Sequence, residues 1–92
     1  MKSLINNDKQ CFICGSIHNI HKHHIYYGTA NRKLSEKYGC WIYLCAEHHN
    51  GSDMGIHFNK PMDEAIKKHC QRLFQEHYKD LDFIKIFGKN YL

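Results

Sequence analysis

The chain has no apolar run that approaches the roughly 20 residues of a membrane-spanning helix. Its first ten residues, MKSLINNDKQ, also lack the apolar core of a signal peptide. We therefore expect neither a membrane span nor secretion. The expected location is the cytoplasm, a reducing compartment in which cysteines stay free or bind metals.

The cysteines cannot all be paired in disulfides, because the sequence has five of them, an odd number. Metal ligation explains part of this set better than a disulfide framework does. The sequence also lacks internal repeats, low-complexity tracts and linkers, so its 92 residues predict a single domain, 1–92. A chain this short has a thin core, which a bound metal often stabilises.

Acidic residues are outnumbered by basic ones. Nine Asp and Glu oppose thirteen Lys and Arg, which gives a net charge of +4. Nine histidines can add positive charge below neutral pH. This mildly basic balance is compatible with a polyanionic partner, but it does not establish one by itself.

The pattern of residue types predicts an α+β fold. Aromatic and β-branched residues predict two short strands, at about 20–27 and 40–45. One or two helical turns are expected between them, around Arg32–Tyr38. The segment 46–59 is rich in Gly, Asn and Asp, which predicts a turn and a loop.

Two helices are expected in the C-terminal third of the chain. Pro61 suits the first turn of the longer helix, and Asn59 can cap it. The apolar stripe of this helix, expected to lie in the core, comprises Ile66, Cys70, Leu73 and Phe74. A shorter helix is expected from Asp82 to Phe87, where Gly88 stops it.

Two pairs of metal-binding residues, each with a two-residue gap, predict a tetrahedral zinc site. The four residues are Cys11, Cys14, Cys45 and His48. The gap lets both donor atoms of a pair reach one ion, and the ion would tie the N-terminal residues to the end of the second strand. A lone Cys-x-x-Cys pair could equally be free or redox-active, but the second pair favours zinc.

The remaining histidines form a second group. His23 and His24 are adjacent on the first expected strand, so their side chains point to opposite faces and cannot easily share one role. One can bind a metal while the other faces a substrate or takes a proton. His49 directly follows the second zinc pair, His57 lies in a Gly-flanked loop, and His21 is expected to lie outside the chemistry. The alternative is a set of ordinary surface or packed histidines.

A Cys-x-x-Cys pair, a His-His pair on a strand and a second strand that ends in LCAEHH together resemble the HNH endonucleases, which have the ββα-metal fold. The pattern is similar in particular to the small zinc-containing HNH proteins of phages and prophages. The resemblance covers about 11–58, roughly half of the chain. The remainder, 59–92, would be a C-terminal helical extension.

The resemblance implies roles for the histidines. His23 would bind a catalytic divalent ion together with His49, and His57 would complete that site. His24 would be the general base that activates a water molecule. HNH enzymes generally use Mg²⁺ or Mn²⁺, whereas imidazole ligands favour Zn²⁺, Ni²⁺ or Mn²⁺ over Mg²⁺, so the identity of the ion stays open.

The family also has an asparagine that braces the loop orienting the base. By spacing, Cys40 occupies that place, which is a departure from the family pattern, and a backbone carbonyl near it is the expected substitute. Arg32 lies between the strands, where it can reach a phosphate at or beside the scissile bond. Further expected contacts to the phosphate backbone are Lys33, Lys60, Lys67, Lys68 and Arg72, any of which can instead belong to an ordinary solvated face.

Together these features predict a metal-dependent HNH endonuclease that hydrolyses duplex or branched DNA and contains a structural zinc. The alternative is a non-catalytic zinc module that binds nucleic acid or protein, which would need neither His24 nor His49. A metal-dependent hydrolase of another phosphoester is the third alternative.

Overall fold

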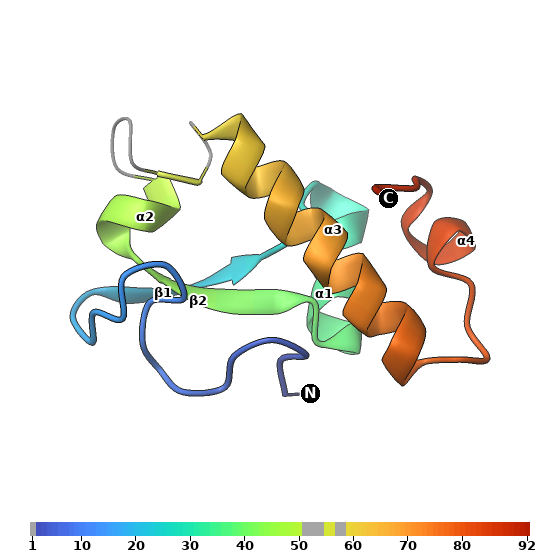
Figure 1. The fold of residues 1–92 in the computed structure, drawn as a ribbon, viewed down its shortest axis with the longest axis horizontal. Coiled ribbons are helices and arrows are strands. Elements are labelled where there is room, and N and C mark those ends of the chain that lie inside the picture. The colour runs from blue at the N-terminus through green and yellow to red at the C-terminus, as the bar shows by residue number, and fades with distance from the viewer. Residues whose placement is uncertain (1, 51–54, 57–58) are drawn as a thin grey trace.

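The computed structural model describes residues 2–50, 55, 56 and 59–92. Figure 1 shows two strands, β1 and β2, with the long helix α3 crossing them and α1, α2 and α4 arranged around them. The fold is therefore a small α+β arrangement with a two-stranded antiparallel sheet, as the sequence predicts. None of the helices in these residues combines the length and the apolar character needed to cross a membrane.

The sheet is a single antiparallel pair. β1 spans Ile20–His24 and β2 spans Trp41–Cys45. The register pairs Ile20 with Cys45 at one end and His24 with Trp41 at the other. Residues directly opposite each other share a face, so His21 and His23 lie on the same face as the fully buried Leu44 and Ile42.

β1 ends three residues earlier than the sequence predicts, because hydrogen bonds to a side chain of α1 replace the hydrogen bonds between the two strands. Ile25 still donates from its amide to the carbonyl of Cys40 at 3.0 Å. The next residue, Tyr26, pairs with the side chain of Ser35, whose hydroxyl donates to the Tyr26 carbonyl at 2.8 Å and accepts from its amide at 3.2 Å. The strand therefore stops where α1 supplies the partner.

Helix α1, Thr29–Tyr38, is longer than the one or two turns expected between the strands. It ends at Gly39, which is in the left-handed region with φ 76°. A side chain at this position would also overlap the carbonyl oxygen of Lys2, and the amide of Leu4 donates to the Gly39 carbonyl at 2.9 Å. Glycine thus both ends α1 and admits the N-terminal segment.

The N-terminal segment covers the outer edge of β2. Ser3 donates from its hydroxyl to the Trp41 carbonyl. The Tyr43 amide donates to the side-chain oxygen of Asn6 at 3.2 Å, and the Phe12 amide donates to the Tyr43 carbonyl at 2.8 Å. A strand edge that would otherwise be open is satisfied within the molecule.

Helix α2, Ala46–Asn50, corrects the prediction of a turn and loop directly after β2. It starts without a break from the strand, and the Ala46 amide donates to the carbonyl of Asn19 at 2.9 Å. Glu47 in its first turn suits the positive end of the helix dipole. The Gly, Asn and Asp residues on which the prediction of a loop was based begin at Asn50, the last residue of α2, and follow it in the sequence.

The two C-terminal helices confirm the sequence prediction. α3 spans Lys60–His77, and the side chain of Asn59 accepts from the Met62 amide at 3.2 Å. α4 spans Phe83–Phe87, is capped by Asp82 and ends at Gly88 with φ 80°. The starts of both helices and the end of α4 therefore lie at cap residues that are recognisable from sequence alone.

The core lies between the sheet, α3 and α4. Of the expected α3 stripe, Ile66, Cys70 and Phe74 are buried and Leu73 is half-buried. The three buried residues pack with Ile42 and Leu44 of the sheet and with an aromatic group comprising Tyr26, Tyr38, Phe83 and Phe87. Each fully buried apolar side chain of this kind contributes roughly 1.5–3 kcal/mol to stability.

Candidate metal centre and histidine cleft

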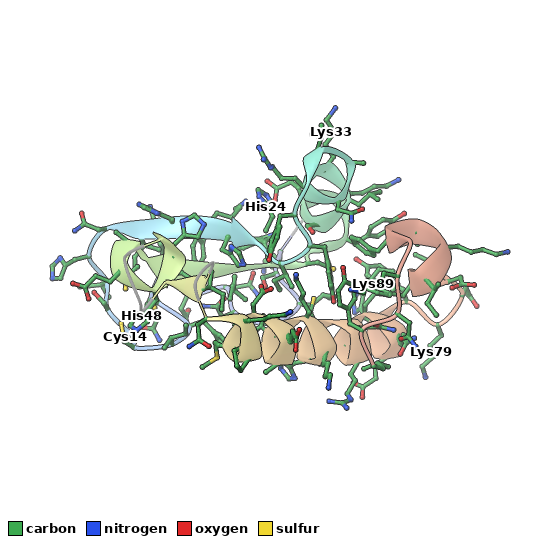
Figure 2. All side chains as sticks on the ribbon, turned by 90° about the horizontal axis from the view of Figure 1, so that it is seen from above. Cys14, His24, Lys33, His48, Lys79 and Lys89 are labelled. Atoms are coloured by element: carbon green, nitrogen blue, oxygen red, sulfur yellow. The ribbon has the colours of Figure 1, made fainter. Side chains whose placement is uncertain are left out.

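Four potential metal ligands converge at one end of the molecule, from a turn of the N-terminal segment, the end of β2 and helix α2. We call them the Cys/His cluster: Cys11, Cys14, Cys45 and His48. Their ligand atoms all lie within 4.8 Å of one another. Figure 2 shows Cys14 and His48 together at the end of the molecule that lies away from α4. The four residues that spacing singled out are therefore brought together.

The distances within the cluster match a single four-coordinate ion. The sulfurs of Cys14 and Cys45 are 3.8 Å apart, and Nδ1 of His48 lies 3.2 Å from the Cys45 sulfur and 3.7 Å from the Cys11 sulfur. Zn–S bonds of about 2.3 Å and Zn–N bonds of about 2.0 Å at tetrahedral angles separate two sulfurs by about 3.8 Å and a sulfur from a nitrogen by about 3.6 Å. The cluster can therefore hold a metal such as zinc with no ligand position left open.

A tight turn places the first two cysteines. The Gly15 amide donates to the Cys11 carbonyl at 2.8 Å, and the Cys11 amide donates to the Ser16 carbonyl at 2.8 Å. Gly15 is in the left-handed region with φ 76°, which a residue without a side chain adopts at little cost. The turn is held against β2 by the bond from Phe12 to Tyr43, so both sulfurs face the end of the strand.

The backbone of this turn favours the thiolate form of Cys11. Burial raises the pKa of the Cys11 thiol, but the amides of Cys45 and of the turn itself outweigh burial and lower the pKa to about 6. For Cys14, the Ser16 amide favours the thiolate, whereas burial and the neighbouring sulfurs raise the pKa overall. Because metals bind thiolates, the turn prepares Cys11 for a metal near neutral pH.

Three histidines gather between β1 and α2. The centroid of the His49 ring lies 5.2 Å from the centroids of both His21 and His23, with the rings edge to face. Nδ1 of His21 is 3.1 Å from Nδ1 of His49, and His23 is 2% exposed. The expected ligands His23 and His49 are thus neighbours. His21, expected outside the chemistry, joins them because residues two apart on a strand share a face.

His24 lies on the opposite face of β1 from His23, as strand alternation predicts. Its Nε2 is 3.6 Å from Oε2 of Glu36 on α1, and Nζ of Lys22 donates to the same carboxylate at 3.1 Å. Burial raises the pKa of Glu36, but Lys22 and His24 outweigh burial and hold the pKa below its usual range. A charged carboxylate therefore faces the imidazole.

Glu36 is a site residue that sequence reasoning missed. It lies twelve positions after His24 and belongs to no recognisable motif. One sequence feature could have indicated it, since Glu36 is the only acidic residue between the two strands. A carboxylate beside an imidazole fixes the ring orientation and stabilises its protonated form.

His23 and His24 line the same cleft although they point to opposite faces. β1 is an edge strand of a two-stranded sheet, so a cleft along its outer edge is accessible from both faces. This histidine cleft has a volume of 360 Å³ and is lined by Lys22, His23, His24, Tyr27, Arg32 and His49. Arg32 therefore lies where the sequence predicted a phosphate contact. Lys33 does not line the cleft, and in Figure 2 it stands at the outer end of α1.

The expected contacts on α3 fall into two groups. Lys60, Lys67 and Lys68 line a second cavity, beside Tyr27 and the C-terminal residues. Arg72 is exposed farther along α3 and lines neither this cavity nor the histidine cleft. The structure thus assembles three of the expected lysines and leaves Arg72 apart from them.

Cys40, which by spacing takes the place of the bracing asparagine, lies in the core. Its side chain is fully buried next to that of Cys70, and the contact with Cys70 together with burial raises the pKa of the Cys40 thiol. Its carbonyl accepts from the Ile25 amide, one residue beyond His24. The contribution of Cys40 near the cleft is therefore a backbone bond that fixes the end of β1, and the group that touches His24 is Glu36.

The third expected ligand, His57, lies outside the described residues. Within the residues that the structure does describe, the Cys/His cluster is the group in which three or more ligand atoms converge on one point. No protein-family model, curated protein or solved structure matches this chain. The function is therefore inferred from the Cys/His cluster and the histidine cleft.

Proposed function

We propose that the protein is a metal-dependent endonuclease of the HNH type, with a ββα-metal core and a structural zinc, that hydrolyses phosphodiester bonds in DNA. One observation supports this most strongly. The histidine cleft combines a histidine pair, a separate histidine backed by a carboxylate, and an arginine, and it lies beside a four-ligand metal cluster. Phosphodiester hydrolysis requires a proton acceptor, charge neutralisation at phosphate and a means of orienting both.

The structural zinc would be held by the Cys/His cluster. Four protein ligands leave no coordination position for substrate, which is typical of a structural site. The cluster joins the N-terminal segment to the end of β2 and to α2. It thereby fixes His49, which directly follows the ligand His48, against His23.

The catalytic ion would be held by His23 and His49, with His57 as the proposed third ligand. The donor set fits, because two imidazole rings with centroids 5.2 Å apart can turn one nitrogen each toward a common point. Imidazole ligands accept Mn²⁺, Ni²⁺ and Zn²⁺ readily, and Mg²⁺ less so. The ion would act as a Lewis acid on a phosphate oxygen and on the leaving oxygen.

His24 would be the general base. Its Nε2 is shielded from solvent and faces Glu36, which leaves Nδ1 as the nitrogen that accepts a proton from water. A neutral imidazole has an ordinary pKa near 6.5, which suits this task at neutral pH. Glu36 would stabilise the imidazolium that forms, and Arg32 would bind a phosphate oxygen and hold the strand in the cleft.

The test is the variant His24→Ala. We expect at least a hundredfold loss of plasmid nicking in the presence of added Mn²⁺ or Mg²⁺, because general-base catalysis contributes about 10²–10⁴-fold. Zinc content and melting temperature should stay as in the wild type, since His24 lies outside the Cys/His cluster. His69→Ala, an exposed histidine on α3, is the matched control and should nick normally.

Equal nicking by His24→Ala and the wild type would overturn the assignment of His24. One observation favours a second candidate, a non-catalytic zinc module that binds nucleic acid or protein: in the described part of the chain only the Cys/His cluster is a closed ligand set. That candidate predicts no metal-stimulated nicking by the wild type under any of the added ions, together with normal zinc content.

A further inference from the structure

The second cavity, which has a volume of 490 Å³, is lined by four lysines, whereas the histidine cleft is lined by one lysine and one arginine besides its histidines. We call it the lysine pocket. Its basic and aromatic lining residues are Lys60, Lys67, Lys68, Lys89, Tyr27 and Tyr91. Four lysines oppose two carboxylates, those of Asp63 and Glu64, so the lining carries a net positive charge. A concave surface with excess positive charge concentrates anions.

One carboxylate of the pocket is already neutralised. Asp63 is 8% exposed, lies 2.9 Å from Nζ of Lys67 and accepts from the hydroxyl of Tyr27 at 2.9 Å. Nζ of Lys67 also lies 4.2 Å from the centre of the Tyr27 ring. Burial lowers the pKa of Lys67, but Asp63 and Tyr27 outweigh burial and raise it, so this lysine stays charged. The Asp63–Lys67 pair is therefore close to neutral, and the excess positive charge of the pocket comes from the other three lysines, which outnumber Glu64.

The other three lysines remain available to a ligand. Lys60, Lys68 and Lys89 are all exposed, and in the described residues none of them has a carboxylate within ion-pair distance. Nζ of Lys89 lies 5.2 Å from the centre of the Tyr91 ring, which orients it along the pocket wall. Figure 2 shows Lys89 beside α3, and the C-terminal residues Lys89, Asn90 and Tyr91 line this side of the pocket.

The wall made by the C-terminal segment is fixed to α3. The buried side chain of Gln71 donates to the side-chain oxygen of Asn90 at 2.9 Å and accepts from the Tyr91 amide at 2.8 Å. The Tyr91 ring packs on Tyr26, with centroids 5.1 Å apart. Because Gln71 and Tyr26 belong to the core, Lys89 and Tyr91 are held in place before any ligand arrives.

The lysine pocket adjoins the histidine cleft, since Tyr27 lines both. We propose that the lysine pocket binds a backbone phosphate of the same DNA molecule whose scissile phosphate lies in the histidine cleft. Lys60, Lys68 and Lys89 would contact the phosphate oxygens, and the rings of Tyr27 and Tyr91 would contact the adjoining sugar or base. This inference rests on the proposed function, because it takes DNA as the occupant of the cleft.

The experiment compares two triple variants with the same loss of charge. One replaces the pocket lysines (Lys60→Gln, Lys68→Gln, Lys89→Gln), and the control replaces exposed lysines elsewhere (Lys37→Gln, Lys79→Gln, Lys85→Gln). Binding of a short fluorescein-labelled DNA duplex is measured by anisotropy over a range of salt concentrations, without added divalent ion. Zinc content and melting temperature are measured on the same samples.

We expect the pocket variant to bind the duplex at least about tenfold more weakly and to lower the slope of log affinity against log salt by about two to three, because each lost phosphate contact lowers it by about 0.9. The control variant should change the slope by less than about one. Equal losses in the two variants would mean that only net charge matters and would overturn the inference. Inorganic phosphate is a second probe. If micromolar phosphate displaces the duplex, the pocket is a site for free phosphate, and the inference is overturned as well.

The result is separable from that of the proposed function. If His24→Ala abolishes nicking while the pocket variant binds and nicks as the wild type does, the nuclease stands and the inference fails. If the wild type does not nick DNA but the pocket variant loses duplex binding selectively, the inference stands for a binding module and the nuclease fails.

Discussion

At the scale of single residues, the side chain of His24 is contacted by a carboxylate. Oε2 of Glu36 on α1 lies 3.6 Å from Nε2 of His24, and Lys22 of β1 forms an ion pair with the same carboxylate. If His24 is the general base, as we propose, Glu36 would position it without touching the substrate. Its effect should therefore appear in the rate of the chemical step and leave substrate binding largely unchanged.

Glu36→Gln tests this positioning role. We expect kcat for DNA cleavage to fall by about tenfold with little change in KM, since partners that orient a catalytic or ligating imidazole are typically worth 10–100-fold. The melting temperature should change by no more than about 8 °C, because exposed ion pairs contribute at most about 1 kcal/mol. Nicking kinetics and thermal melting measure the two effects.

Glu36→Asp keeps the charge and should recover part of the lost rate, whereas Glu76→Gln, an exposed glutamate on α3, should behave as the wild type. A Glu36→Gln variant with unchanged kcat would remove Glu36 from the mechanism. A loss of rate that parallels a loss of zinc or of folded protein would assign it a structural role instead.

At the scale of elements, α3 is the helix on which the fold depends. Its buried side, with Ile66, Cys70 and Phe74, packs in the core, while its exposed side carries Lys60 and Lys68 of the lysine pocket. Phe74 contacts four aromatic rings at centroid distances of 4.8–6.0 Å, those of Tyr78, Phe83, Tyr38 and Phe87. Truncating it would open a cavity at the centre of the core.

Phe74→Ala should lower the free energy of unfolding by about 3–5 kcal/mol, the usual cost of removing a buried aromatic side chain. For a domain of this size the melting temperature should fall by at least about 12 °C. Circular dichroism during chemical and thermal unfolding measures both quantities. Phe12→Ala, at a phenylalanine that is 40% exposed, is the matched control, and a similar loss in the two variants would contradict the central place of Phe74.

Elements with local signals were predictable from sequence, and elements decided by distant contacts were not. Asn59, Asp82 and Gly88 mark helix ends through bonds to residues at most four positions away, so α3 and α4 could be read directly. The end of β1 depends on the hydrogen bond from Ser35 to Tyr26, nine residues earlier in the chain, and no local sequence pattern predicts this contact. The start of α2 likewise depends on a bond to Asn19.

The same distinction holds for the candidate site. The Cys/His cluster was predictable because a two-residue gap fixes which donor atoms can share an ion. The contact between His21 and His49 joins residues 28 positions apart, and that between His24 and Glu36 joins two elements that only the folded chain brings together. Neither contact can be predicted from the spacing of these residues in the sequence.

At the scale of the whole molecule, the Cys/His cluster joins segments that the small core holds only in part. Removal of the metal with a chelator should therefore lower the melting temperature by more than about 10 °C or abolish cooperative unfolding, since structural zinc contributes folding free energy directly. Metal analysis should find one equivalent of zinc before chelation. His48→Ala should mimic the chelator, and the exposed His18→Ala should not.

Acid should release the metal in the same way. Protons compete with the metal for all four ligands, because a metal binds thiolates and neutral imidazole. The lowered pKa of Cys11, about 6 without metal, keeps this thiol ionised at neutral pH. Zinc release followed with a colorimetric indicator should be low at neutral pH and should rise as the pH is lowered. Retention of zinc in the chelated or acidified protein, or unchanged stability after its loss, would contradict a structural site.

The N-terminal segment connects this metal to the surface of the sheet. It carries Cys11 and Cys14, and the same stretch supplies the hydrogen-bonding partners along the outer edge of β2. Without a metal, the segment would be held to β2 by these hydrogen bonds alone, and the amides and carbonyls of that strand would become accessible to other chains more often. A metal in the Cys/His cluster would then limit aggregation through intermolecular strand pairing as well as stabilise the fold.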